Sequence, residues 1–170
     1  MADFKLPRAT LRSLSTGPGK GQLYQGTALN LTAADTGKNY TLMADSDAQV
    51  VITLPTLTAD MNGTEYLFYI AETSTGGYQF NCGVDTDAFK GYLVLGTASG
   101  AQDANGLFRA CGSSMDRISI KSGETNGGGG EGSMLRMTAV VGSLGIWGVE
   151  GCILTADVDS DGSALFVNTS

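Results

Sequence analysis

The sequence predicts an all-β fold and, within that class, an antiparallel β-sandwich of the jelly-roll type with an extended N-terminal arm. Three observations support this prediction. Apolar and polar residues alternate with a period of two in many short segments, which is typical of strands with one buried face. No stretch of helical length carries a helical period. The 170 residues include 25 glycines and only 3 prolines, which suits short strands joined by tight turns.

The first 21 residues are expected to form the arm, and residues 22–170 the β-sandwich body. The arm segment has no clear period, and "GPGKG" at 17–21 interrupts both helices and strands. Fully extended, ~20 residues span roughly 65 Å, far enough to leave their own subunit. The alternative is a solvated terminus, but such a tail needs no apolar anchors. The anchors here are Phe4, Leu6, Leu11 and Leu14.

Charge is distributed unevenly between these two parts. Residues 1–20 hold four basic groups (Lys5, Arg8, Arg12 and Lys20) against one acidic group, a balance of +3. The other 150 residues hold 6 basic and 16 acidic groups, a balance of −10, which gives the chain its net −7. An acidic body repels nucleic acid, because affinity for phosphate comes mainly from Lys and Arg. We therefore expect no nucleic-acid partner.

About ten segments of the body are expected to be strands. Residues 48–54 ("AQVVITL") place Val50, Ile52 and Leu54 on one face, and 117–121 ("RISIK") alternates in the same way. Residues 66–71 ("YLFYIA") are apolar on both faces, as expected of a central strand. The other candidates are 39–44 ("NYTLMA"), 78–82 ("YQFNC"), 91–96 ("GYLVLG"), 106–111 ("GLFRAC"), 134–141 ("MLRMTAVV"), 145–150 ("GIWGVE") and 163–168 ("SALFVN").

Two similar phrases are expected to be corners between strands. In "LTAADTG" (31–37), Thr32 caps a single helical turn, and Gly37 ends it in the left-handed conformation. In "LTADMNG" (57–63), Thr58 and Gly63 take the same roles. A third "LTAD" begins at 154 with a very different spacing, which argues against a solenoid repeat.

The segment "ETNGGGGEGS" at 124–133 is expected to be a flexible surface hairpin. Four consecutive glycines carry a high backbone entropy, which opposes regular structure. A phosphate cradle requires a following helix and usually a Lys, whereas a predicted strand follows here.

The residue inventory argues against an enzyme. There is no histidine, which removes the commonest general base and most zinc and iron sites. The three cysteines (Cys82, Cys111 and Cys152) are widely spaced and are expected to be buried thiols rather than a disulfide framework or a zinc site. Two carboxylate pairs, Asp45/Asp47 and Asp85/Asp87, leave a glycosidase as a minor alternative.

One motif points to a metal. Asp157, Asp159 and Asp161 followed by Gly162 match the first half of a calcium loop, because alternate positions turn their carboxylates toward one point. The twelfth position of that loop is Asn168 instead of the bidentate Glu. An acidic hairpin turn is the favoured interpretation, and a weak structural calcium site is the alternative. No other cofactor is expected.

Trp147 is the single tryptophan, and it admits two interpretations. An exposed Trp stacks on sugars, but one flanked by Ile146 and Val149 is more often a core residue, which is the favoured interpretation. The longest apolar stretch, 139–154, is broken by glycines and Glu150, so no membrane span is expected. The opening "MADFKLPRATLRSL" lacks the apolar segment of a signal peptide.

Several of these segments also carry a family resemblance. They are "LTAADTGKNYTL", "VVITLP" and "GTEYLFYI", followed by "MLRMTAVV" and "GIWGVEG" as a closing hairpin, so that the resemblance covers about 30–154. They resemble structural proteins of tailed bacteriophage particles, most closely the capsid decoration (cement) proteins. The lack of a long coiled-coil or β-helical shaft makes a full-length tail fibre a poorer match.

The resemblance implies a non-enzymatic virion protein, made in the host cytoplasm, that binds the outer surface of the head and stabilises the shell. It implies a homotrimer whose partner is the major capsid protein. No functional residue transfers from the family, so the capsid-binding residues are those that the sequence of the arm offers: Phe4, Lys5, Leu6, Arg8, Leu11, Arg12, Leu14 and Lys20. The alternative function is a receptor- or glycan-binding head domain of a tail fibre or head fibre, with Trp147 or the loop Asp157–Asp161 as its binding residues.

Overall fold

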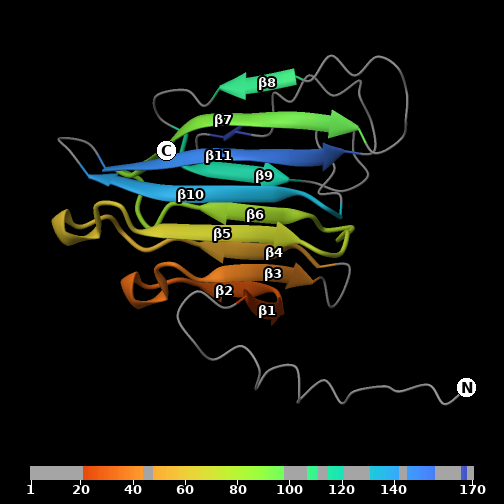
Figure 1. Cartoon of the computed structure of the whole chain (residues 1–170), viewed down its shortest axis with the longest axis horizontal. Helices are drawn as coiled ribbons and strands as arrows, with labels where there is room; N and C mark the ends of the chain where they lie inside the picture. Colours follow the sequence, from red (N-terminus) through yellow and green to blue (C-terminus); the bar gives the residue numbers. More distant parts are fainter. Residues whose placement is uncertain are drawn as a thin grey trace, which may run out of the picture.

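The computed structural model describes residues 21–43, 48–97, 107–110, 115–120, 131–141, 145–155 and 166–167, and these form two β-sheets that pack face to face (Figure 1). The large sheet has the strand order β1 (Gly21–Gln25), β3 (Asn39–Met43), β5 (Glu65–Ile70), β10 (Met134–Val141), β11 (Gly145–Thr155), β7 (Ala88–Thr97) and β8 (Leu107–Ala110). The small sheet has the order β12 (Phe166–Val167), β9 (Arg117–Ile120), β6 (Tyr78–Asn81), β4 (Val50–Thr53) and β2 (Ala28–Asn30).

The all-β prediction is confirmed, whereas the prediction of antiparallel sheets is wrong. Five of the ten strand pairs in the described residues are parallel: β1–β3, β3–β5, β2–β4, β4–β6 and β7–β11. Four of these pairs, all except β7–β11, result from the winding of the first six strands, which alternate between the large and the small sheet. A chain that crosses to the other sheet and back returns in its original direction, so successive strands of one sheet run parallel.

The two predicted corners are confirmed. Each is one turn of 3-10 helix, η1 (Ala33–Asp35) and η2 (Ala59–Met61), preceded by an extended Thr at the N-cap. Gly37 and Gly63 follow with φ of 73° and 81°, the left-handed region that glycine adopts without strain. The two corners lie at the same end of the body and lead into the neighbouring strands β3 and β5 (Figure 1). The repeated phrase thus marks two successive crossings of the chain from the small sheet to the large sheet, from β2 to β3 and from β4 to β5.

Asp35 holds the first corner together. Its carboxylate accepts hydrogen bonds from the backbone N–H of Thr32 (2.8 Å) and from the Thr32 hydroxyl (2.6 Å), and it pairs with Lys38 at 2.5 Å. Burial by itself raises the pKa of this carboxyl group, but the bonds from Lys38 and Thr32 outweigh it and lower the pKa below the ordinary value. Asp35 therefore connects Thr32 and Lys38, which lie on either side of it within seven residues of sequence.

The core lies between the two sheets and is rich in aromatic rings. Phe68 of β5 meets Phe80 of β6 across the sheets, with ring centroids 5.0 Å apart and planes at 66°. Phe68 also stacks on Tyr40 of β3, and Trp147 of β11 contacts Tyr66 of β5. Trp147 is fully buried, which confirms the core interpretation and rules out sugar stacking by this residue.

The predicted strands are found in each of the described segments, and β10 and β11 form the expected antiparallel hairpin. The glycine-rich segment 124–133 was expected to be a hairpin loop, but this is wrong, because the strands on either side of it, β9 and β10, belong to different sheets. Strands β1 and β2 had no individual prediction. Over the part of the chain that the structure describes, no helix is long and apolar enough to cross a membrane.

Candidate functional site

Large apolar side chains are exposed mainly on one surface, the outer face of the large sheet. Five of them are 41–49% exposed and alternate in sequence with core residues of the same strands. For example, Tyr69 points outward between buried Phe68 and Ile70. The five are Leu23, Tyr69, Tyr92, Met134 and Val140. A cluster of exposed apolar residues on one face is a feature of binding surfaces.

The strand register places part of this set in a row that crosses the sheet. From β1 to β7 the paired residues are Leu23, Thr41, Tyr69, Met134, Cys152 and Val94. Cys152 is exposed in this row, so the expectation that all three thiols are buried is wrong for this residue. Cys82 is buried as expected, and Cys111 lies outside the described residues. Cys152 is exposed because it belongs to the outward set of β11, directly opposite Met134.

A charged cluster lies beside this row. The Arg136 guanidinium contacts two carboxylates, Glu150 at 2.8 Å (Nη1 to Oε1) and Glu65 at 3.4 Å (Nε to Oε1). All three side chains are 45–49% exposed. Ion pairs this exposed contribute at most about 1 kcal/mol each to stability. The strand register brings these three polar groups together on the face, from β5, β10 and β11.

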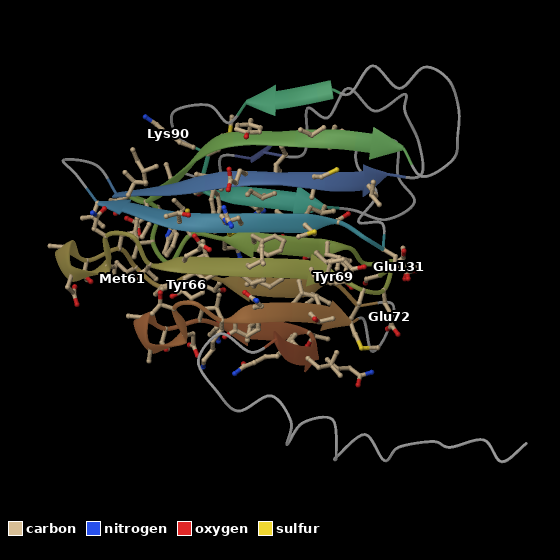
Figure 2. The ribbon with its side chains drawn as sticks, in the orientation of Figure 1. Met61, Tyr66, Tyr69, Glu72, Lys90 and Glu131 are labelled. Atoms are coloured by element: carbon tan, nitrogen blue, oxygen red, sulfur yellow. The ribbon has the colours of Figure 1, made fainter. Side chains whose placement is uncertain are left out.

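A shallow groove runs along β10, β11 and β7 between these groups. It consists of two adjoining depressions, of about 310 and 400 Å³, that share Tyr92, Arg136 and Glu150 in their walls. We call it the Tyr92 groove. Lys90 lies near the start of β7, whereas Tyr69 lies toward the other end of the face on β5 and does not line the groove (Figure 2).

Gly148 explains why the surface is hollow at this point. It lies on the outward set of β11, between Thr138 of β10 and Lys90 of β7, and it has no side chain to fill the space. A Cβ atom built on Gly148 would lie 3.4 Å from the Thr138 carbonyl oxygen and 3.7 Å from Val140 Cγ2, which are ordinary contacts. Backbone geometry therefore permits a side chain here, and such a side chain would enter the first of the two depressions.

The sequence-predicted site residues have different outcomes. The arm residues Phe4, Lys5, Leu6, Arg8, Leu11, Arg12, Leu14 and Lys20 lie outside the described residues, as do Asp45, Asp47 and the calcium candidates Asp157, Asp159 and Asp161. Within the described ranges, no three His, Cys, Asp or Glu side chains are grouped to hold a metal ion.

The carboxylate pair Asp85/Asp87 does not form a shared cleft. Asp85 is exposed, whereas Asp87 is buried and accepts a hydrogen bond from the Leu57 N–H at 2.9 Å. A Cβ atom on Gly145 would lie 2.2 Å from Asp87 Oδ1, so Asp87 fills the space beside the first residue of β11. Asp87 therefore joins the segment before η2 to the starts of β7 and β11, which is a structural role.

Sequence reasoning did not identify the Tyr92 groove. Part of it could have been predicted from the hairpin of β10 and β11. The register of that hairpin pairs Arg136 with Glu150, and opposite charges at paired positions predict an ion pair. Glu65 and Tyr92 join them from strands that are distant in sequence. Comparison of the chain with protein-family models, curated proteins and solved structures gave no significant match.

Proposed function

We propose that this protein is a non-enzymatic decoration protein of a tailed-bacteriophage capsid, which binds the outside of the head through residues 1–21 and stabilises the shell. The main observation behind the proposal is the difference in net charge between residues 1–20 and the rest of the chain. The first 20 residues have a balance of +3, and the other 150 have −10. The described body starts at Gly21, on the edge strand β1 of the large sheet (Figure 1).

Entry at an edge strand suits this role. An arm that joins the body at an edge strand does not have to cross either sheet face. The arm can therefore bind the capsid while the outer face of the large sheet stays available for other contacts. The body itself is a two-layer sandwich with an aromatic core, which suits a fixed spacer between contacts. The resemblance of residues 30–154 to phage structural proteins is the reason for proposing a phage head as the surface that is bound.

Stabilisation then follows from mass action. A protein that binds only the mature arrangement of shell subunits stabilises that arrangement, as any ligand does that favours one state. Several copies joined as the proposed homotrimer multiply the effect, because the second and third contacts become intramolecular. Modest contacts by each arm are therefore sufficient.

The test compares three forms of the protein for binding to heads that lack it. We expect the full chain to bind and to raise the temperature at which the heads rupture. A chain without residues 1–20 should remain folded and lose most of its binding. A third form, with Lys5, Arg8, Arg12 and Lys20 replaced by Gln, measures the charge contribution through the salt dependence of binding.

Two results would contradict the proposal. One is equal decoration by the chain that lacks residues 1–20. The other is equal heat survival of heads with and without the protein, together with its presence at the tail tip or an ability of the free protein to block adsorption to cells. The second result would favour the alternative of a receptor-binding head domain.

A further inference from the structure

The Tyr92 groove combines two kinds of wall. On one side are apolar groups, namely Leu67, Val94 and Met134, with the ring of Tyr92, which is 47% exposed. On the other side are hydrogen-bonding groups: Glu65, Lys90, Arg136, Thr138 and Glu150. Tyr92, Arg136 and Glu150 line both depressions and so lie where the two kinds of wall meet.

This combination matches the chemistry of one class of ligand. A pyranose sugar has an apolar C–H surface, which packs on an aromatic ring, and a rim of hydroxyl groups, which need both donors and acceptors. An exposed Tyr supplies the ring, because it offers a large rigid apolar surface with a polar end. Arg136 supplies donors, and the carboxylates of Glu65 and Glu150 supply acceptors. We propose that the Tyr92 groove is a binding site for an uncharged oligosaccharide.

The charge balance of the groove argues for an uncharged ligand. Its walls contain two carboxylates, Glu65 and Glu150, and two cations, Lys90 and Arg136. These cancel, so neither an acidic nor a basic ligand gains from net attraction. Arg136 already pairs with both carboxylates. Each carboxylate still keeps lone pairs that can accept hydrogen bonds from hydroxyl groups.

The shape of the groove argues for a chain of sugars. The two depressions, of about 310 and 400 Å³, are each comparable with small-molecule sites, which occupy ~300–1,000 Å³. They adjoin through three shared residues and lie on an open face. Such a surface contacts internal units of an oligosaccharide from one side. If the arm attaches the protein to a phage head, this face would hold the phage particle near polysaccharide. Binding of an oligosaccharide by the groove does not itself depend on the capsid proposal.

Direct binding measurements on the full chain test the inference. The ligands are short neutral oligomers of glucose, mannose, galactose and N-acetylglucosamine, with polygalacturonate and heparin fragments as acidic comparisons. We expect titration calorimetry and protein-detected NMR to show binding of at least one neutral oligomer, with shifts at Tyr92 and Arg136. Neither acidic ligand should bind more tightly than that oligomer.

Three variants locate the site. Tyr92→Ala should weaken binding about tenfold or more, and Gly148→Ala should also weaken it, because a methyl group enters the floor of the groove. Tyr69→Ala is the matched control: Tyr69 has similar exposure (41%) on the same face but lies outside the groove, so binding should not change. Circular dichroism and melting temperature check that each variant is folded.

The following results of the binding measurements would overturn the inference. Failure of all the neutral oligomers to bind, or binding that Tyr92→Ala leaves unchanged, removes the site. Binding of the acidic ligands alone would show a charge-driven surface instead, and occupation of the groove by a second copy of the chain would show a protein interface. Because all measurements use the free protein, they fail or succeed separately from attachment to heads.

Discussion

Trp147 and Tyr66 are in contact within the core, with ring centroids 5.6 Å apart and planes tilted by 45°. Only one of the two has a hydrogen-bond partner for its polar group in the described part of the chain. The Tyr66 hydroxyl donates a hydrogen bond to the Thr32 carbonyl oxygen at 2.8 Å, which ties the core to the first corner. The Trp147 Nε1–H is buried and has no acceptor among the described residues. The core therefore gains the packing of a large indole ring and carries the cost of an unsatisfied donor.

The full burial of the indole ring predicts unequal effects of two substitutions at Trp147. Trp147→Ala should lower the free energy of unfolding by about 3–5 kcal/mol, the usual cost of a large cavity. Trp147→Phe should cost much less, because the phenyl ring leaves a smaller cavity. Both variants also remove the buried unsatisfied donor, which offsets about 1–3 kcal/mol of either loss. Urea denaturation followed by circular dichroism measures both. A loss for Trp147→Phe as large as that for Trp147→Ala would contradict this account of the packing around Trp147.

The two glycines Gly91 and Gly148 should respond in opposite ways to Ala. Gly91 has φ of 144°, and a Cβ there would lie 1.9 Å from the Val149 carbonyl oxygen. Gly91→Ala should therefore strain or separate β7 from β11 and lower the melting temperature by several degrees. Gly148→Ala should leave the melting temperature unchanged within about 2 °C, because its Cβ makes ordinary contacts and the change removes backbone entropy from the unfolded chain. A scan by differential calorimetry compares them, and a stable Gly91→Ala protein would contradict this account of the β7–β11 contact.

Asp87 should matter for stability and Asp85 should not. Asp87→Ala leaves the Leu57 N–H without its acceptor in a partly buried position, which should cost about 1–3 kcal/mol. Asp85→Ala changes an exposed side chain two residues away and should stay within about 0.5 kcal/mol of the parent. Equilibrium unfolding in urea gives both values. A large effect at Asp85 instead would reverse the assignment of the structural carboxylate.

Alkaline pH should destabilise the fold through its buried tyrosines. Burial raises the pKa of Tyr66 to about 12 and that of Tyr78 to about 12, and the charges of Asp35 and Glu72 respectively add to these shifts. In the unfolded chain these phenols lose their protons near pH 10. Their contribution is therefore fully present below about pH 10 and is lost as the pH rises toward about 12.

The measurement is the free energy of unfolding between pH 9 and 12 (roughly the range of tyrosine titration). Tyr78→Phe removes one of the two phenols together with its bond to the Glu72 carbonyl oxygen, so the variant should start less stable and lose stability less steeply. An equally steep loss in Tyr66→Phe and Tyr78→Phe as in the parent would assign the alkaline transition to other groups.

Much of the local structure was determined by the sequence alone. The period of two identified strands such as β4 and β9, because a strand between core and solvent requires that alternation. The corners at η1 and η2 were also predictable, because in each one a Thr bonds a nearby Asp and a Gly takes the left-handed conformation. Burial of Trp147 followed from its apolar flanks.

Only the tertiary structure decided which strands pair and in which direction. Backbone N–H and C=O groups are the same in every strand, so local sequence does not distinguish a parallel neighbour from an antiparallel one. The alternation of the first six strands between two sheets made four of the pairs parallel, the pairing of β7 with β11 added a fifth, and together they overturned the antiparallel prediction. The same pairing brought Glu65, Tyr92, Arg136 and Glu150 from four strands to one groove. That juxtaposition depends on long-range register, because side chains far apart in sequence become neighbours only when the sheet has formed.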